Sequence, residues 1–186
     1  MSKFSALRVS EHQPHELNVE YIQRHLRHED LYEMHASGMT PDQLPFVVKC
    51  ASVIGEAWVL FWDGKPVFVW GVMSHVPGLY GLFGFGTPDT KRAMPSITRW
   101  GMKTWLPDFL ARSNARRIEV RVPASSVHSI NWLKRLGMVP ECTLPRYSVV
   151  GEDFLQLALT VGQPHVHTGT FRHQGTHAPA SRSSAH

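Results

Sequence analysis

Hydrophobic residues recur along the chain with two different periods, and the change of period separates helices from strands. Residues 6–9 form a short apolar run that predicts a first strand. Over residues 14–27 the apolar side chains lie three or four positions apart, which predicts a helix. Residues 28–38 continue this pattern for a turn or two and end at a glycine. The stretch TPDQ at residues 40–43 has the form of a helix start, and the apolar positions after it predict a helix through Ala51.

After these helices the apolar period changes to two, which is typical of strands with one buried face. Residues 56–62 and 66–72 are two such runs. The Asp63-Gly64 pair between them is a strong signal for a β-hairpin. The glycine-rich run at residues 79–86 predicts a third strand beside this pair.

The second half of the chain returns to helices before it ends in strands. A long helix is expected over residues 87–113, with a kink at Pro107. The run RRIEVRV at residues 116–122 predicts a strand, and residues 125–136 predict a helix capped by Gly137. Two closing strands are expected around residues 146–150 and 153–161.

The composition indicates one folded domain followed by a polar tail. Of the 186 residues, 42% are hydrophobic and 18% are charged, which is ordinary for a soluble globular protein. The length suits a single domain. Residues 1–161 are expected to form that domain. Residues 162–186 are rich in Gly, Pro, Ser, Thr and His, and they are predicted to be a disordered tail.

Charge and cysteine content limit the classes of function. A formal net charge of +4 permits contact with nucleic acid but does not require it. No stretch approaches the roughly 20 apolar residues of a membrane span. Cys50 and Cys142 form neither a C-x-x-C motif nor a disulfide framework, so the chain is expected to be reduced and intracellular. The spacings of His25, His28 and His35 do not form an H-x-x-x-H ligand pair, and the histidines of the tail lack a fixed scaffold, so no metal site is expected.

The order of the predicted elements resembles that of the GNAT fold, the fold of the Gcn5-related N-acetyltransferases. That order is strand, two helices, three antiparallel strands, helix, strand, helix and two strands, over residues 6–160. The resemblance implies an α/β (α+β) domain with a mixed, mostly antiparallel sheet flanked by helices. It also implies that the fourth strand splays from the fifth and that the pantetheine arm of acyl-CoA lies in the gap. Acetyl-CoA is the cofactor to expect if the protein is active.

Four separated motifs resemble a narrower group of proteins. The motifs are DLYEMHASGMTP, DGKPVFVWGV, GTPD and SINWLKRLGM. They resemble the small GNAT-like proteins of short-tailed bacteriophages, which are acetyltransferase-like proteins or internal virion and virion-assembly proteins. This resemblance implies core, portal or ejection proteins of the virion as partners, and non-specific contact with packaged DNA. It implies a location in the virion, and in the host cytoplasm during assembly.

The segment after the third antiparallel strand is where the resemblance implies a site for the cofactor pyrophosphate. Active GNATs carry Arg/Gln-x-x-Gly-x-Gly/Ala there, because bare backbone must approach the phosphates closely. This chain reads GTPDTKRAMPS and has no glycine pair between Thr87 and Ile97. The candidate cofactor-binding residues are therefore Thr87, Thr90, Lys91 and Arg92, of which the last two attract phosphates by charge.

The catalytic positions depart from the family pattern as well. The family often has a glutamate base on the fourth strand, but residues 79–85 contain no carboxylate. Asp89, just beyond that strand, and Glu119, on the next strand, are the candidate bases. Active members have an Asn before the following helix and a Tyr seven residues later that protonates the leaving thiolate. The corresponding residues here are Ser126 and Leu133, and leucine cannot donate a proton.

These departures leave two functions open. The first is a catalytically degenerate bacteriophage protein, a pseudoenzyme that serves as a virion-associated or virion-assembly component. The second is an active acetyl-CoA-dependent N-acetyltransferase that modifies a host or phage amine. The sequence favours the first function, because the base, the acid and the phosphate loop all differ from those of active members.

Overall fold

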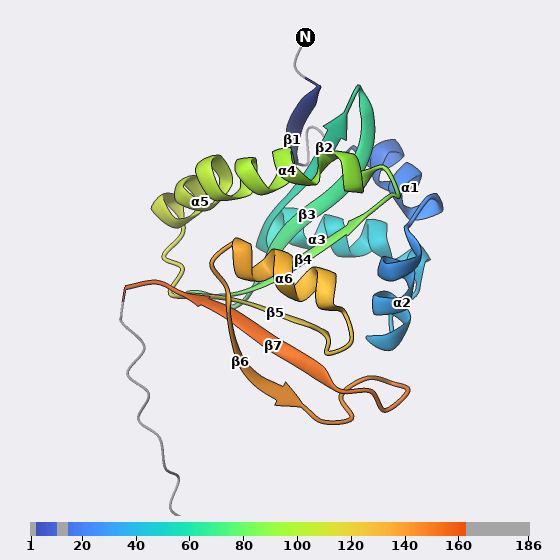
Figure 1. Cartoon of the computed structure of the whole chain (residues 1–186). Coiled ribbons are helices and arrows are strands. Elements are labelled where there is room, and N and C mark those ends of the chain that lie inside the picture. The colour runs from blue at the N-terminus through green and yellow to red at the C-terminus, as the bar shows by residue number, and fades with distance from the viewer. Residues whose placement is uncertain (1–2, 11–14, 163–186) are drawn as a thin grey trace, which may run out of the picture.

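The strands of the protein form one seven-stranded sheet in a computed structural model that describes residues 3–10 and 15–162 (Figure 1). The strands are β1 (Phe4–Val9), β2 (Gly55–Trp62), β3 (Lys65–Val76), β4 (Leu79–Gly86), β5 (Arg117–Pro123), β6 (Val139–Leu144) and β7 (Phe154–Thr160). Their order is β1-β2-β3-β4-β5-β7-β6, and only β4 and β5 pair in parallel. This confirms the mixed, mostly antiparallel sheet that the resemblance implies. Of the predicted tail, residues 162–186, all but Gly162 lies outside the described residues.

Helices cover both faces of this sheet. They are α1 (Glu16–Arg24), α2 (His28–Ala36), the 3₁₀-helix η1 (Pro41–Gln43), α3 (Leu44–Ile54), α4 (Thr90–Trp100), the π-helix η2 (Gly101–Trp105), α5 (Leu106–Arg112) and α6 (Val127–Arg135). On one face α4, α5 and α6 pack over a core that includes Phe68 and Leu157. On the other face α1 and α3 pack against Val59 and Val69. None of these helices is long and apolar enough to cross a membrane.

Two local signals in the sequence are confirmed at the positions where they were expected. The β2–β3 hairpin turns at Asp63, with φ 49, and Gly64, with φ 77. A two-residue hairpin turn requires such left-handed values, which Asp tolerates and glycine adopts without strain. The helix start at residues 40–43 is also present, since the Thr40 N–H donates to Gln43 Oε1 at 2.8 Å before α3 begins.

The helix expected over residues 87–113 is divided into α4, the π-helix η2 and α5. At the end of η2 the Leu106 N–H donates to the Gly101 C=O, five residues back instead of four. Pro107 follows in the first turn of α5, where it has no N–H to donate. The irregularity predicted at Pro107 is therefore a widened turn that ends just before the proline.

The strand prediction for residues 146–150 is wrong. The sixth strand is β6, and residues 146–150 belong to the loop between β6 and β7. In that loop Arg146 has φ 52, a left-handed value that no extended strand contains. The residue that obscured β6 is Pro140, which lies at a register shift of this edge strand. A missing N–H is tolerated at a bulge or on an edge, so the proline did not end the strand.

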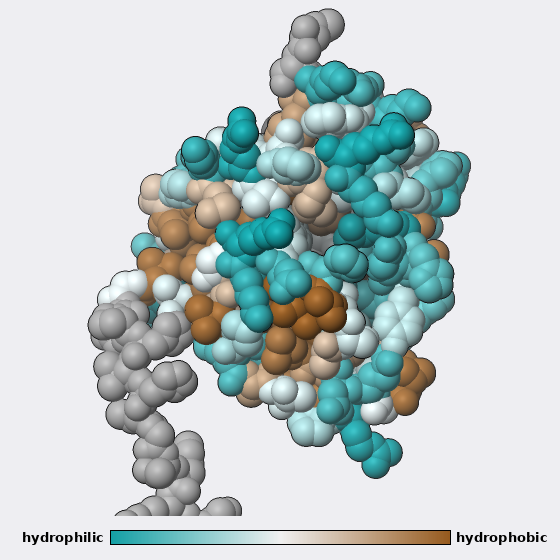
Figure 2. Space-filling view, in the orientation of Figure 1, coloured by the Kyte–Doolittle hydropathy of each residue, from teal (hydrophilic) through white to brown (hydrophobic). Residues whose placement is uncertain are grey.

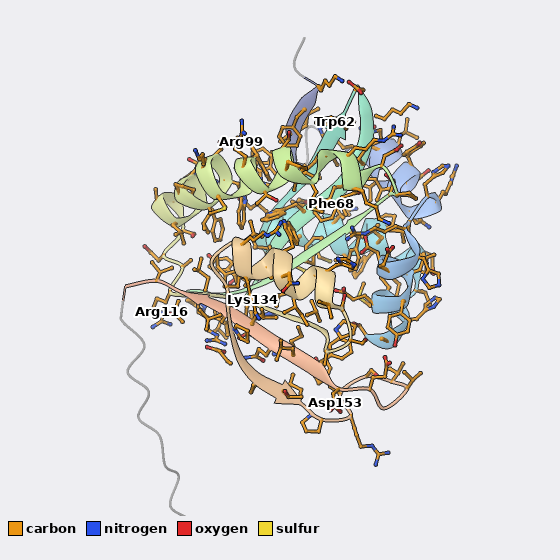
Figure 3. All side chains as sticks on the ribbon, in the orientation of Figure 1. Trp62, Phe68, Arg99, Arg116, Lys134 and Asp153 are labelled. Atoms are coloured by element: carbon orange, nitrogen blue, oxygen red, sulfur yellow. The ribbon has the colours of Figure 1, made fainter. Side chains whose placement is uncertain are left out.

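Aromatic rings fix α6 against the middle of the sheet. The ring of Trp70, on β3, lies 5.5 Å from that of Trp132 on α6 and 4.8 Å from that of Trp105. Phe68 lies between α4 and α6 (Figure 3), with its ring 6.0 Å from that of Trp132. Trp100 joins the same cluster through Trp70. Trp70 and Trp132 of this cluster form part of one wall of the gap described next.

Candidate functional site

β4 and β5 separate after three paired residues and leave a gap in the sheet. Leu79–Gly81 pairs with Arg117–Glu119, and beyond these segments the two strands diverge (Figure 1). In the same view α6 lies in front of the gap and α2 lies at its open end. This separation is the arrangement that the GNAT resemblance implies for the fourth and fifth strands.

A cavity of about 180 Å³ lies in the gap, and we name it the inner chamber. One side of it is ionisable and is formed by Asp30 and Glu33 of α2 and by Arg27, the residue before α2. The other sides come from β3, from α6 and from the diverging strands, where Arg121 of β5 is a further charged group. Its apolar lining includes Trp70, Leu82, Phe85, Val120, Trp132 and Leu133. The chamber therefore combines ionisable groups with a largely apolar wall.

A larger cavity of about 960 Å³, the outer chamber, lies between the start of α2, the first turns of α4 and the length of α6. Arg27, Ser129 and Trp132 line both chambers and form the neck between them. The surface over α2 and the start of α4 is mostly hydrophilic (Figure 2). The ionised side chains that line the outer chamber are Arg27, Lys91, Arg135 and Glu29.

The free edge of β4 is held at its end by the first turn of α2. The Arg27 N–H donates to the Gly86 C=O at 2.9 Å, and the Gly86 N–H donates to Asp30 Oδ2 at 2.6 Å. The other oxygen of Asp30 pairs with the Arg27 guanidinium at 2.9 Å. Burial raises the pKa of Asp30, while Arg27 and the Gly86 N–H oppose that rise. This contact fixes α2 at the mouth of the gap.

Glu33 is the most perturbed acid in the gap. Burial and, next, the negative charge of Asp30 raise its pKa to about 8, against the opposing charge of Arg27. No hydrogen bond to its carboxylate is recorded from the described residues. A carboxyl group with a pKa near neutral pH exchanges its proton readily under physiological conditions. Glu33 is therefore a candidate proton acceptor inside the chamber.

Sequence reasoning missed Glu33 because the resemblance assigns no role to this helix. One signal was present in the stretch HEDLYE. Glu29, Asp30 and Glu33 are spaced so that they share one side of a helix, which is unusual unless that side meets solvent or a site. The burial that raises the pKa depends on β4 and β5, which are distant in the sequence.

The four residues predicted for the phosphate region do not converge on one place. Lys91 lines the outer chamber, and its Nζ lies 3.6 Å from Glu29 Oε1. Thr90 is buried, and its hydroxyl donates to a β3 carbonyl at 2.6 Å. Thr87 is also buried, whereas Arg92 is exposed and lines neither chamber. Of the four residues, the structure brings Lys91 alone to the cavity wall.

The backbone N–H groups at the start of α4 are already hydrogen-bonded to backbone carbonyls of the same segment. Those of residues 90–92 donate to the carbonyls three positions earlier, at 3.0 to 3.4 Å. Pro95, in the next turn, has no N–H. A phosphate at a helix start is normally bound by such free N–H groups. An anion in the outer chamber therefore meets side chains more readily than this backbone.

The three predicted catalytic residues lie in different surroundings. Asp89 is exposed at the start of α4 and lines neither chamber. Glu119 is buried on β5, where two arginines of the same strand hold its carboxylate at 2.8 and 3.1 Å. Ser126 lines the outer chamber, and its hydroxyl donates to Ser129 Oγ at 3.0 Å. Leu133 lines the inner chamber and offers no proton there.

No family model and no curated protein matches this sequence, but solved structures do match the fold. One is yncA, a putative acetyltransferase from Salmonella typhimurium with its cofactor acetyl-CoA (12% identity, 88% of this chain and 96% of that chain, TM-score 0.64). A second is the ribosomal-protein-S18-alanine N-acetyltransferase from Escherichia coli (15%, 90% and 99%, TM-score 0.63). A third is a GNAT-family acetyltransferase from Bacillus anthracis (10%, 86% and 95%, TM-score 0.58). The chain therefore has the GNAT fold.

The side chains of the two chambers fit a ligand with an anionic end and an apolar arm, such as acetyl-CoA. The outer chamber has three cations and one carboxylate in its lining. Arg27, at the neck, has a buried Nε with no hydrogen-bond partner among the described residues. The apolar wall of the inner chamber suits a pantetheine arm. The fit depends on side-chain cations rather than on the glycine-rich loop that active GNATs carry.

Proposed function

We propose that this protein is an acyl-CoA-dependent N-acyltransferase in which Glu33 accepts a proton from the acceptor amine. The observation that carries the proposal is the chamber in the gap between β4 and β5, which Glu33 lines with a pKa raised by burial to about 8. A general base works best when its pKa lies near the working pH. A strongly acidic carboxylate would leave an ammonium ion protonated, whereas Glu33 is basic enough to share that proton.

Each side chain of the site has a defined part in this reaction. The acyl donor supplies an acyl group as a thioester, and the amine nitrogen forms a bond to its carbonyl carbon as the C–S bond breaks. Glu33 takes the proton that the nitrogen loses. Leu133 cannot protonate the departing thiolate, so that proton comes from solvent or from a hydroxyl such as that of Ser129 at the neck. Absence of a dedicated acid typically slows such a step about 10²–10⁴-fold.

An amine is the acceptor class that the inner chamber supports. Its lining includes Glu33, whose carboxyl group can accept the one proton that a neutral amine loses as it is acylated, beside the charges of Arg27, Asp30 and Arg121. The solved neighbour from Escherichia coli is an alanine N-acetyltransferase of a ribosomal protein. That likeness supports an amine acceptor for this chain without selecting a particular one.

Isothermal titration of the full chain with acetyl-CoA, and separately with CoA, tests the first requirement of this function. We expect micromolar binding of both ligands and slow release of CoA thiol when an amine is added. No binding at millimolar ligand would remove the acyltransferase proposal, because the protein would have no acyl donor.

A second candidate function is supported by the altered parts of the site. We propose as the alternative a non-catalytic bacteriophage protein that is virion-associated or acts in virion assembly, with core, portal or ejection proteins as partners and some contact with packaged DNA. It is favoured by Leu133, which replaces an acid, and by the internally bonded N–H groups of residues 90–92. Mass spectrometry of purified virions tests it, and absence of the protein from the particle would exclude it.

A further inference from the structure

Arg27 places a cation at the neck between the two chambers and leaves part of it unpaired. Its side chain is 17% exposed, and one terminal nitrogen pairs with Asp30 Oδ1 at 2.9 Å. Its Nε is buried and has no hydrogen-bond partner among the described residues. A guanidinium carries five N–H donors, and an unpaired buried donor is unfavourable. The side chain therefore retains the capacity to bind an anion rich in oxygen atoms.

Two further cations line the outer chamber, which begins at this neck. Lys91, on α4, is exposed and lies 3.6 Å from Glu29, a solvent-exposed contact of little strength. Arg135, at the end of α6, makes no ion pair with residues 3–10 or 15–162. Together with Arg27, the residue before α2, they bring three cations from separate segments to a chamber whose lining contains a single carboxylate.

We infer that Arg27, Lys91 and Arg135 form an anion site that binds the phosphate groups of the acyl donor in place of the backbone at the start of α4. This inference rests on the proposed function. A ligand that spans both chambers must pass Arg27, since that residue lines both. Its anionic end then lies among the three cations, and its reacting end lies beside Glu33.

The chemistry of the two alternatives supports the side chains over the backbone. The N–H groups of residues 90–92 are already bonded to carbonyls, so binding a phosphate there would require those bonds to break. Guanidinium groups, in contrast, bind phosphate oxygens through paired, charge-assisted hydrogen bonds. Arg27 has in its Nε–H a donor that gains a partner, while its terminal nitrogen keeps the pair with Asp30.

Titration calorimetry with three probes separates this site from other ways of binding. The probes are CoA, pantetheine, which has the same arm without phosphates, and inorganic pyrophosphate. The variants are Arg27→Gln, Lys91→Gln and Arg135→Gln. Each should weaken CoA and pyrophosphate about tenfold or more, since each removes a hydrogen bond to a charged group, and should leave pantetheine binding unchanged. The matched control is Arg92→Gln, which removes an exposed cation of α4 that lines neither chamber and should change none of the three affinities.

The outcomes distinguish failure of the anion site from failure of the proposed function. Unchanged CoA affinity in Lys91→Gln and Arg135→Gln would overturn the site while the acyltransferase proposal stands, and these two exposed positions keep the test valid if Arg27→Gln does not fold. Pyrophosphate binding that depends on Arg27, without CoA binding, would support the anion site and remove the acyl donor. Loss of CoA affinity in Arg92→Gln equal to that in the three variants would also overturn the site. Failure of the unaltered protein to bind either ligand would overturn both.

Discussion

Two glutamates of this protein are in opposite situations, one in the core and one at the wall of the inner chamber. Glu56, on β2, is 2% exposed and accepts hydrogen bonds from the indole nitrogens of Trp105 at 2.6 Å and Trp58 at 3.3 Å. It also pairs with Arg112 at 3.1 Å and Arg8 at 3.4 Å. Glu33, on α2, has an acidic neighbour in Asp30, and its carboxylate accepts no hydrogen bond from the residues that the structure describes.

The difference shows which buried acid serves the fold and which is available for chemistry. Four groups from β1, β2, η2 and α5 converge on Glu56, so its charge is compensated and its position is fixed. Buried charges need such partners. Glu33 lacks them, so it keeps its proton to a higher pH and faces an open chamber. Exposure and partners both separate the two residues, since Glu56 is buried among four partners and Glu33 is half-buried at the wall of a chamber.

The largest effect is expected from Glu33→Gln on catalysis. The amide has nearly the same shape but cannot accept a proton from the amine. With acetyl-CoA and a reactive amine, kcat/KM should fall about 10²–10⁴-fold, as for loss of a general base. The affinity for CoA should stay unchanged, because the anion site does not include this residue. A rate within twofold of the unaltered protein, about 0.4 kcal/mol by the usual conversion, would show that Glu33 is not the base.

Glu56→Ala should have a comparable effect, on stability instead of on catalysis. The substitution leaves two indole N–H groups and two arginines without their shared acceptor. Removing one partner of a buried charged network costs about 3–5 kcal/mol, which urea denaturation followed by tryptophan fluorescence would measure. Arg8→Ala is the matched control, because its side chain is 49% exposed and lies 3.4 Å away; a loss below about 1 kcal/mol is expected there. Equal losses in the two variants would contradict the central role given to Glu56.

A smaller effect should distinguish Glu33 by its dependence on pH. The unfolded chain releases this proton near the ordinary value of 4.5, whereas the folded protein keeps it until about pH 8. Stability is therefore lost as the pH rises between these values, since the unfolded state binds fewer protons there. Glu33→Gln removes that loss and should stabilise the protein by about 1–3 kcal/mol at pH 8.

Thermal melts at several pH values would measure this effect. The gain in Tm from Glu33→Gln should be largest at pH 8 and should shrink towards pH 5, where both proteins are uncharged at this position in the folded state. A gain that is independent of pH would show that the raised pKa does not cause it. If the expected result is found, Glu33→Gln lowers activity and raises stability, as is expected where a functional group is held at a cost in stability.

The sequence predicted what depends on neighbours along the chain. The hairpin at Asp63 and Gly64 and the helix start at residues 40–43 were both predicted from local pattern. The lack of a glycine pair between Thr87 and Ile97 was also visible in the sequence, by comparison with the motif of the family that the chain resembles. The strand β6 was not predicted, because Pro140 argued against a strand. The proline is tolerated at an edge position and a register shift, and both features depend on how the sheet is assembled.

The candidate site was less predictable because long-range contacts create it. The pKa of Glu33 depends on burial against β4 and β5, and the place of α2 depends on the bonds from Arg27 and Asp30 to Gly86, more than fifty residues away in the sequence. The candidates Asp89 and Glu119 were found by proximity to the family motif. Although both residues are close to that motif in the sequence, neither lines either chamber.

The smallest effect is expected from Asp89→Asn, and that result would sharpen the contrast between the two kinds of acid. The Asp89 side chain is exposed and lines neither chamber, so substitution there should change kcat/KM by less than about twofold, within the range of ordinary surface substitutions. In the same assay Glu33→Gln should show the large fall in kcat/KM described above. A fall of about tenfold or more for Asp89→Asn, with Glu33→Gln unaffected, would move the base from the chamber to the start of α4. The perturbed pKa of Glu33 would then be a consequence of how α2 closes the gap in the sheet rather than a sign of catalysis.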